Sequence, residues 1–265
     1  MSTTPYTIVK WQEGQQQTIS VDVVDEEPLS IRVQGNPYAV VMRTPGDDLA
    51  HAAGFCLTEG LIDLPDDMVN LSTCDDDETN VVTITLTPER RKRITDHLDR
   101  RGYISQTSCG ICGKTIVEEL MQLLEPIDDT ISIGLQAAEQ CLRTLERHQP
   151  LRRSSAASHA AVLFNAELKH LAVAEDVGRH NALDKAIGRL FLDGKLDQAK
   201  VAVMSSRISY ELVQKAMRAR IPILMGLSRP TSLALNLADQ LNITIVGATK
   251  TTGLLIFTHP ERLAR

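Results

Sequence analysis

The spacing of apolar residues divides the chain into a β-rich first part and a second part in which helices and strands alternate. Alternating apolar and polar residues predict strands at residues 18–23, 29–33, 38–42 and 81–86. After the third of these, apolar residues at helical spacing from Leu49 to Leu57 predict a helix that begins near Pro45 and buries Cys56. The first hundred residues therefore predict a small α+β unit.

The second part predicts a sheet covered by helices. Strands are expected at residues 160–164, 168–174, 201–204, 223–225 and 243–246, and helices at 116–124, 135–145, 181–192, 209–219 and 231–240. Such alternation is typical of a mostly parallel sheet with helices on its faces. We expect an α/β protein in which a β-rich α+β domain, residues 1–107, precedes an α/β domain, residues 108–265, that begins with a mobile cysteine loop.

Composition excludes several classes of protein. The chain is 43% hydrophobic and 23% charged, which is ordinary for a globular protein. A net charge of -6 and a pI near 5.7 argue against nucleic acid as a partner. We expect a cytoplasmic protein without a membrane partner, because no apolar run is long enough to cross a bilayer and the N-terminus lacks a signal sequence. The odd count of five cysteines predicts reduced thiols.

A basic stretch lies shortly before two of the cysteines. It comprises Arg90–Arg93 and continues with Arg100 and Arg101. We interpret it as the solvated face of a helix. The alternative is that its charge attracts an acidic partner or an anionic ligand toward the thiols.

Cys109 and Cys112 form the most informative motif, because cysteines at this spacing can form a disulfide, supply half of a zinc site or leave one nucleophilic thiolate. A structural zinc site needs two more ligands, and the other three cysteines are isolated, so we expect no metal. A thioredoxin-like dithiol stays open. The flanking Gly110 and Gly113, and a helix expected from Lys114, favour an exposed loop that carries a thiolate.

A second constellation follows the predicted strands of the α/β part, where parallel sheets bind their ligands. Polar and basic side chains recur there, and the candidates for an anion site include His180, Ser206, Arg207 and Ser228. Each of these residues could also have a purely structural role. Serine and threonine cap helices, and His180 is able to form a surface pair with Asp184, one turn later.

Four segments together resemble a known family, the formate dehydrogenase accessory sulfurtransferases, FdhD/NarQ. They are residues 54–62, 108–113, 175–185 and 205–211. The resemblance implies that the α/β part is a cytidine-deaminase-like three-layer α/β/α domain. It also implies that Cys109 accepts persulfide sulfur from a cysteine desulfurase, with Cys112 as the accessory or relay thiol. The recipient would be the molybdenum cofactor, bis-molybdopterin guanine dinucleotide, before it enters formate dehydrogenase.

The family's cofactor segment falls near the C-terminus, on Ala248, Thr249, Lys250, Thr251, Thr252 and Gly253. Here the chain departs from the family pattern, because Ala248 and the pair Thr252–Gly253 replace its usual aromatic and arginine positions. Lys250 alone keeps a positive charge. The resemblance implies that bis-molybdopterin guanine dinucleotide binds as a substrate, and a free guanine nucleotide is a further candidate. The expected partners are the cysteine desulfurase, the formate dehydrogenase catalytic subunit and a second copy of the chain in a homodimer.

Two other functions stay open. The chain could be a non-catalytic chaperone that binds the cofactor or the apo-dehydrogenase and uses its cysteines only for docking. A structural zinc protein is the weaker third candidate.

Overall fold

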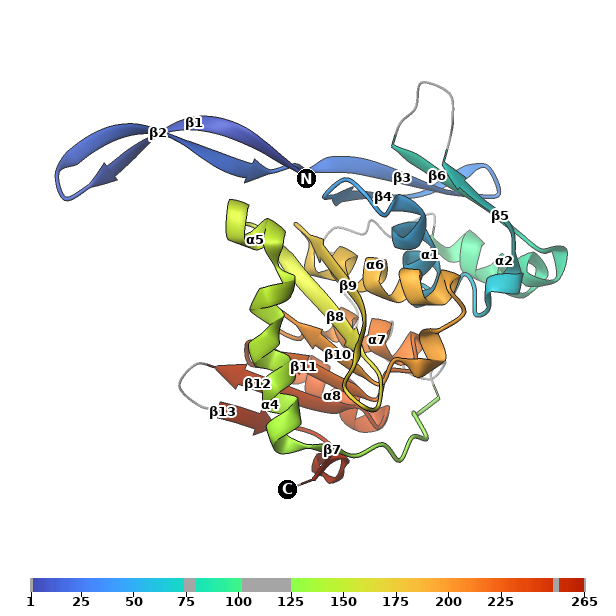
Figure 1. Ribbon diagram of the computed structural model, residues 1–265. Coiled ribbons are helices and arrows are strands. Elements are labelled where there is room, and N and C mark those ends of the chain that lie inside the picture. Colours follow the sequence, from blue (N-terminus) through green and yellow to red (C-terminus); the bar gives the residue numbers. More distant parts are fainter. Residues whose placement is uncertain (1, 74–79, 102–124, 250–252, 265) are drawn as a thin grey trace.

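The computed structural model describes residues 2–73, 80–101, 125–249 and 253–264. It has a small sheet with a projecting hairpin in its first part and a larger sheet between helices in its second part (Figure 1). No helix in these ranges is both long enough and apolar enough to span a bilayer.

The projecting hairpin consists of β1 (Thr3–Gln12) and β2 (Gln15–Val24), which pair along their full length and extend away from the body of the molecule (Figure 1). Glu13 and Gly14 make the turn with φ 51° and φ 80°, as a two-residue hairpin turn with positive φ at both positions requires. The sequence predicted only the second strand. The first was missed because most of its residues are exposed, so no buried face imposes a clear alternation.

The small sheet has the order β4-β3-β6-β5 and is covered by a helix on its buried face. Its strands are β3 (Glu27–Val33), β4 (Asn36–Arg43), β5 (Met68–Thr73) and β6 (Val81–Leu86). Leu29 and Ile31 face the core beside α1 (Asp48–Thr58) and are fully buried. Cys56 of α1 is also fully buried, which confirms its predicted place in the core. A short 3-10 turn, η1 (Pro65–Asp67), leads into β5.

The basic stretch lies on α2 (Pro88–Arg101), a helix as expected, but its interpretation as a solvated face is wrong for Arg90. Arg90 is buried, and its guanidinium donates hydrogen bonds to the Leu61 and Gly60 carbonyl oxygens, both at 2.8 Å, and pairs with Asp63. Arg91, Lys92 and Arg93 are exposed. One arginine of the run therefore anchors α2 to the end of α1.

The large sheet has six strands in the order β13-β12-β11-β10-β8-β9. They are β8 (His159–Phe164), β9 (His170–Asp176), β10 (Val201–Met204), β11 (Ile223–Gly226), β12 (Thr244–Thr249) and β13 (Gly253–Ile256). The prediction of a mostly parallel sheet is only partly right. The ladders β10–β11 and β11–β12 are parallel, but β8 runs antiparallel to both of its neighbours and β13 antiparallel to β12.

Helices cover both faces of the large sheet (Figure 1). One face carries α6 (Arg179–Leu192), α7 (Tyr210–Arg218) and α8 (Ser232–Gln240), and the other carries α4 (Leu135–Thr144), on which Cys141 is buried as predicted. Short elements complete the fold: η2 (Leu145–His148), α5 (Pro150–Ser155), η3 (Leu196–Gln198), η4 (Pro260–Arg262) and the pair β7 (Ile133–Gly134) and β14 (Leu263–Ala264). The specific likeness to cytidine deaminases stays a prediction.

One hydrophobic core runs from the small sheet through α1 to α6 and the large sheet. Leu29 of β3, Ile187 of α6 and Ile245 of β12 all belong to it. The two parts of the chain therefore share a core, and the division at residue 107 stays a prediction because the residues on both sides of it lie outside the described ranges.

Candidate functional site

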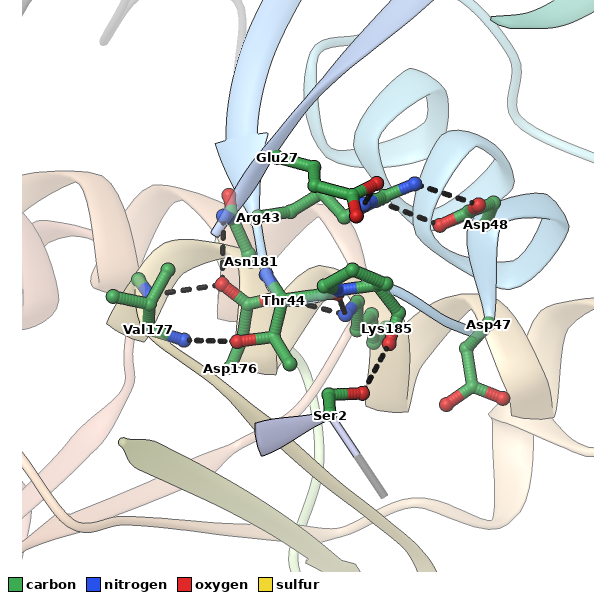
Figure 2. Close-up of polar contacts among 12 residues, drawn as sticks. Ser2, Glu27, Arg43, Thr44, Asp47, Asp48, Asp176, Val177, Asn181 and Lys185 are labelled. Carbon is green, nitrogen blue, oxygen red and sulfur yellow. Dashed lines mark hydrogen bonds and ion pairs between the residues drawn. The ribbon is translucent and has the colours of Figure 1, made fainter. Parts of the chain in front are cut away.

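The motif at residues 175–185 joins the two parts of the chain through the side chain of Asp176 (Figure 2). Asp176 is fully buried, accepts a hydrogen bond from the Thr44 backbone N–H at 3.0 Å, and pairs with Lys185 at 2.7 Å. The side chain of Thr44 makes a second hydrogen bond to the same segment, because its Oγ1 accepts from the Val177 N–H at 3.0 Å. Asn181 donates to Asp176 at 2.9 Å and to the Met42 carbonyl oxygen at 2.7 Å. These residues of the motif therefore hold the end of β9 against the end of β4.

A second buried network starts from Asp184 of α6, the residue directly before Lys185. Asp184 pairs with Lys215 of α7 at 2.8 Å and accepts a hydrogen bond from the Thr58 hydroxyl at 2.8 Å. Lys215 also donates to Thr58 at 3.0 Å. The suggested pair of Asp184 with His180 is therefore wrong, because Asp184 faces the protein interior. The network joins the last residue of α1 to buried positions within α6 and α7.

The predicted anion site corresponds to one edge of the large sheet, which we call the strand-end face. It is defined by His159, Arg179, His180, Ser205, Ser206, Arg207, Ser209, Glu211, Ser228 and Ala248. The register brings these together: Asp176 at the end of β9 lies opposite His159, and Met204 at the end of β10 lies beside Gly226 of β11. Gly226 in turn lies beside Gly247 of β12. The carboxyl ends of four strands thus share this edge.

His180 stands on the strand-end face in the first turn of α6, half-buried. Its Nε2 lies 3.4 Å from the Ser209 hydroxyl and 3.9 Å from the Glu211 carboxylate. Burial, together with the charges of Arg179 and Lys215, lowers the pKa of His180 to about 4, against the opposing charge of Glu211. The imidazole is therefore neutral near pH 7 and available to accept a proton.

The serines of the predicted set lie in the loops after β10 and β11. Ser206 is buried and donates to the Arg207 carbonyl oxygen at 3.1 Å, whereas the Arg207 side chain is exposed. A Cβ on Gly226 would lie 2.8 Å from the Ser206 carbonyl oxygen, and a Cβ on Gly247 would lie 3.0 Å from the Ser228 carbonyl oxygen. The two glycines therefore allow these loops to fold closely over the neighbouring strand ends.

The predicted cofactor segment is only partly described. Ala248 is half-buried near the end of β12, Thr249 is the last residue of that strand, and Gly253 opens β13 with φ 67°. Lys250, Thr251 and Thr252 lie outside the described residues, as do Cys109 and Cys112. The assignments of these residues, and of the segment to a cofactor, stay predictions.

The candidate set from the sequence lacked five members of the strand-end face: His159, Arg179, Ser205, Ser209 and Glu211. His159 was missed because β8 runs antiparallel to β10, so its first residue, and not its last, reaches this edge. Its Nδ1 lies 3.4 Å from the hydroxyl of Ser205, the residue directly after β10. The other four lie within the segments 175–185 and 205–211, and this position was the sequence signal that could have identified them.

Comparisons with known proteins agree with one another. The model of the FdhD/NarQ family matches residues 24–264. The sulfur carrier protein FdhD of Xanthomonas campestris pv. campestris (strain B100) is 35% identical over 258 residues, covering 97% of this chain and 91% of that protein. The protein of the same name from Streptomyces avermitilis is 36% identical over 269 residues, covering 97% and 94%.

A solved structure has the same fold. It is a crystal structure described as that of a formate dehydrogenase accessory protein from Desulfotalea psychrophila. The two chains superpose with a TM-score of 0.79 and 22% sequence identity over 100% of each. At this identity the likeness shows the shared fold, in which the helices and sheets above are arranged alike.

Proposed function

The chain belongs to the FdhD/NarQ family, and from that premise we propose that it is a sulfur carrier in the maturation of formate dehydrogenase. The observation that carries this proposal is 35% identity, over 97% of the chain, to a protein named as a sulfur carrier. Geometry supports it, because three of the four segments that resemble the family meet in one place. Thr58, Asp184 and Lys215, in or beside these segments, are joined by hydrogen bonds.

The chemistry we assign to the pair of cysteines begins at Cys109. Its thiolate attacks the terminal sulfur of a persulfide on a cysteine desulfurase, an S–S bond forms at Cys109, and the desulfurase cysteine leaves as a thiolate. Cys112 then attacks the Cys109 sulfur and expels the terminal sulfur as hydrosulfide. Formation of the Cys109–Cys112 disulfide supplies the two electrons that reduce the terminal sulfur to hydrosulfide. An external dithiol then reduces the disulfide back to two thiols.

The recipient in this proposal is the molybdenum cofactor, bis-molybdopterin guanine dinucleotide, bound as a substrate at the strand-end face. What supports this location is its content of positive charge and hydroxyl groups, with Arg207 exposed and Arg179 half-buried. An N-terminal helix end adds to the attraction for phosphate, because α6 begins at Arg179. The formate dehydrogenase catalytic subunit, the homodimer and the cytoplasmic location remain expectations.

Mass spectrometry tests the persulfide step directly. Incubation with a cysteine desulfurase and cysteine should add the mass of one sulfur atom to the chain, and Cys109→Ala should abolish the addition. Cys141→Ala is the matched control and should keep it, because Cys141 is buried on α4. An adduct that persists in Cys109→Ala contradicts the proposal.

Complementation separates the carrier from a chaperone. A Cys109→Ser protein that fully activates formate dehydrogenase would show that the chain acts by binding alone. The Cys112→Ala variant should form the adduct but fail to restore activity, because hydrosulfide release then lacks its internal electron source. Metal analysis of the purified chain tests the remaining possibility of structural zinc.

A further inference from the structure

Three of the basic side chains on the strand-end face lie near one another, and Glu211 is the acid of that face beside them. His159 begins β8, and Arg179 and His180 form the first turn of α6. The Nε of Arg179 is buried and has no hydrogen-bond partner among the described residues. A buried guanidinium nitrogen without an acceptor is costly, and a bound oxyanion would remove that cost.

The surroundings of the two histidines favour an anion. The Nδ1 of His159 lies 3.4 Å from the Ser205 hydroxyl, and this hydroxyl also accepts a hydrogen bond from the Ala160 N–H at 2.9 Å. A neutral His159 that accepts the Ser205 proton at Nδ1 carries its own proton on Nε2, where it can be donated to a ligand. The first turn of α6 adds backbone N–H groups, because its N-cap, Gly178, has no side chain to satisfy them. Hydroxyl, guanidinium and helix N-terminus are the usual donors to a tetrahedral oxyanion.

The positive groups also act on one another. Burial, and then the charges of Arg179 and Arg152 of α5, lower the pKa of His159, while Asp176 of β9 opposes them. His180 is lowered in the same way by Arg179, Lys215 and His159. Both imidazoles therefore stay neutral until a negative charge enters between them.

Glu211 is the acid of α7 that faces this cluster. Burial would raise its pKa, but hydrogen bonds from the Ser209 side chain and from its own backbone N–H, together with the charge of Arg179, outweigh burial and lower the pKa. It lies 3.9 Å from the ring of His180 and forms no close pair with Arg179 among the described contacts. Asp176 is neutralised by Lys185 at 2.7 Å. The acids nearby thus leave Arg179 for a ligand.

We propose that His159, Arg179 and His180 form an oxyanion site that takes up a proton when it fills. Arg179 provides the permanent charge, and the anion attracts a proton onto an imidazole of His180 or His159, which then donates a hydrogen bond to it. The ligand is a tetrahedral oxyanion, either free or as the phosphate of a nucleotide. This inference rests on the proposed function only where the ligand is the phosphate of a nucleotide. Proton-coupled binding itself is measured without sulfur transfer.

Calorimetric titration tests the site with two probes that keep a constant charge between about pH 5 and 8, namely sulfate and diguanosine pyrophosphate. Affinity should rise as the pH falls, by up to about tenfold per pH unit for one coupled proton. Titration in buffers of different ionisation enthalpy should show proton uptake. Tighter binding of the dinucleotide identifies a nucleotide phosphate as the ligand, and equal binding identifies a free oxyanion.

Variants separate the permanent charge that we assign to Arg179 from the proton uptake that we assign to the histidines. Arg179→Gln should weaken both probes about 10- to 100-fold at every pH, the range for a hydrogen bond to a charged group. His180→Gln should mainly flatten the pH dependence, and His159→Gln serves as a second variant if that protein folds poorly. Lys169→Gln, an exposed change at the far end of the β8–β9 hairpin, is the control and should alter neither.

The result that overturns the inference is binding whose pH dependence survives in both histidine variants, or the absence of binding by either probe. Sulfur loading separates this failure from that of the proposed function. The unsubstituted chain should gain the mass of one sulfur atom from the desulfurase whether or not it binds either probe, because the oxyanion site takes no part in the first transfer. If no protein gains sulfur, the unsubstituted chain included, the proposed sulfur carrier function is contradicted. The oxyanion site is then still decided by the calorimetric titration alone.

Discussion

Gly188 of α6 lies so close to Ala50 of α1 that a Cβ on Gly188 would stand 1.8 Å from the Ala50 carbonyl oxygen. The relation is reciprocal, since a Cβ on Gly54 would stand 1.9 Å from the Asp184 carbonyl oxygen. The two helices can cross at this distance only because each has a glycine at the crossing point. Their close approach is what places the Thr58 hydroxyl 2.8 Å from the Asp184 carboxylate.

Replacing Gly188 by alanine should therefore push α1 away from α6. We expect Gly188→Ala to lower the free energy of unfolding by about 1–3 kcal/mol or more, as overpacking in a rigid core does. Urea denaturation followed by circular dichroism measures the loss. Gly134→Ala is the matched control, because a Cβ there meets nothing within 4 Å and φ is -68°. Equal stability of the two variants would show that the crossing is not as close as described.

The Asp184–Lys215 pair makes a second prediction about stability. Both side chains are buried, so Lys215→Met should leave a carboxylate in the interior without its partner and cost about 3–5 kcal/mol. The double variant Asp184→Leu/Lys215→Met should recover part of that loss, since no lone charge is then buried. Lys195→Met removes an exposed pair with Asp193 and should cost at most about 1 kcal/mol. A double variant that is no more stable than the single one would contradict this account.

His51 of α1 makes stability depend on pH. It is fully buried between the two networks, with Asn181 as a polar neighbour of its ring. Burial and the charges of Lys185, Lys215 and Arg43 lower its pKa well below the usual value. The unfolded chain binds a proton at His51 below about pH 6.5, whereas the folded chain does not, so stability present above that pH is lost as the pH falls.

The expected slope is up to about 1.4 kcal/mol per pH unit between about pH 6.5 and 5 from His51 alone. Thermal unfolding at several pH values measures it, and His51→Leu should make it shallower. Leucine has no polar atom that needs a hydrogen bond, so we expect no loss of stability near pH 7 from a missing hydrogen bond. Lys169→Gln, at an exposed position, is the control and should keep the original slope. An unchanged slope in His51→Leu would mean that other groups set the pH dependence.

Much of the fold followed from the pattern of apolar residues, because its strands are buried and short. Residues 201–204 were predicted as a strand and are β10, and the helix expected at 135–145 is α4 (Leu135–Thr144). The helix expected at 231–240 is α8 (Ser232–Gln240), and Thr231 is its N-cap, because its Oγ1 accepts a hydrogen bond from the Ala234 N–H at 3.3 Å. The predictions failed where no buried face guides the pattern, as in β1, or where strand direction matters, as in β8.

The candidate site was harder to predict for a physical reason. Serine, histidine and arginine have the same local pattern whether they cap a helix, bind a ligand or form a buried pair. Asp176 and Lys185 illustrate this, because their segment was expected to border a ligand site and they instead form a fully buried pair that holds β9 to β4. Only the three-dimensional register distinguishes these residues from His180, which lies on the same segment but faces the strand-end face.

The buried cysteines lead to a last prediction, on selectivity. Burial raises the pKa of the Cys56 thiol strongly, and it also raises the pKa of Cys141. Because the thiolate is the nucleophile, neither should react at neutral pH in the folded protein. After loading by a cysteine desulfurase and digestion, the added sulfur should therefore be found on the peptide with Cys109 and not on those with Cys56 or Cys141. Iodoacetamide should likewise alkylate Cys109 faster than Cys56 and Cys141 in the native chain. In urea the three cysteines should react at similar rates. Sulfur on Cys56 in folded protein would mean that α1 separates from α6 during transfer, and Gly188→Ala, which loosens that contact, would then increase it.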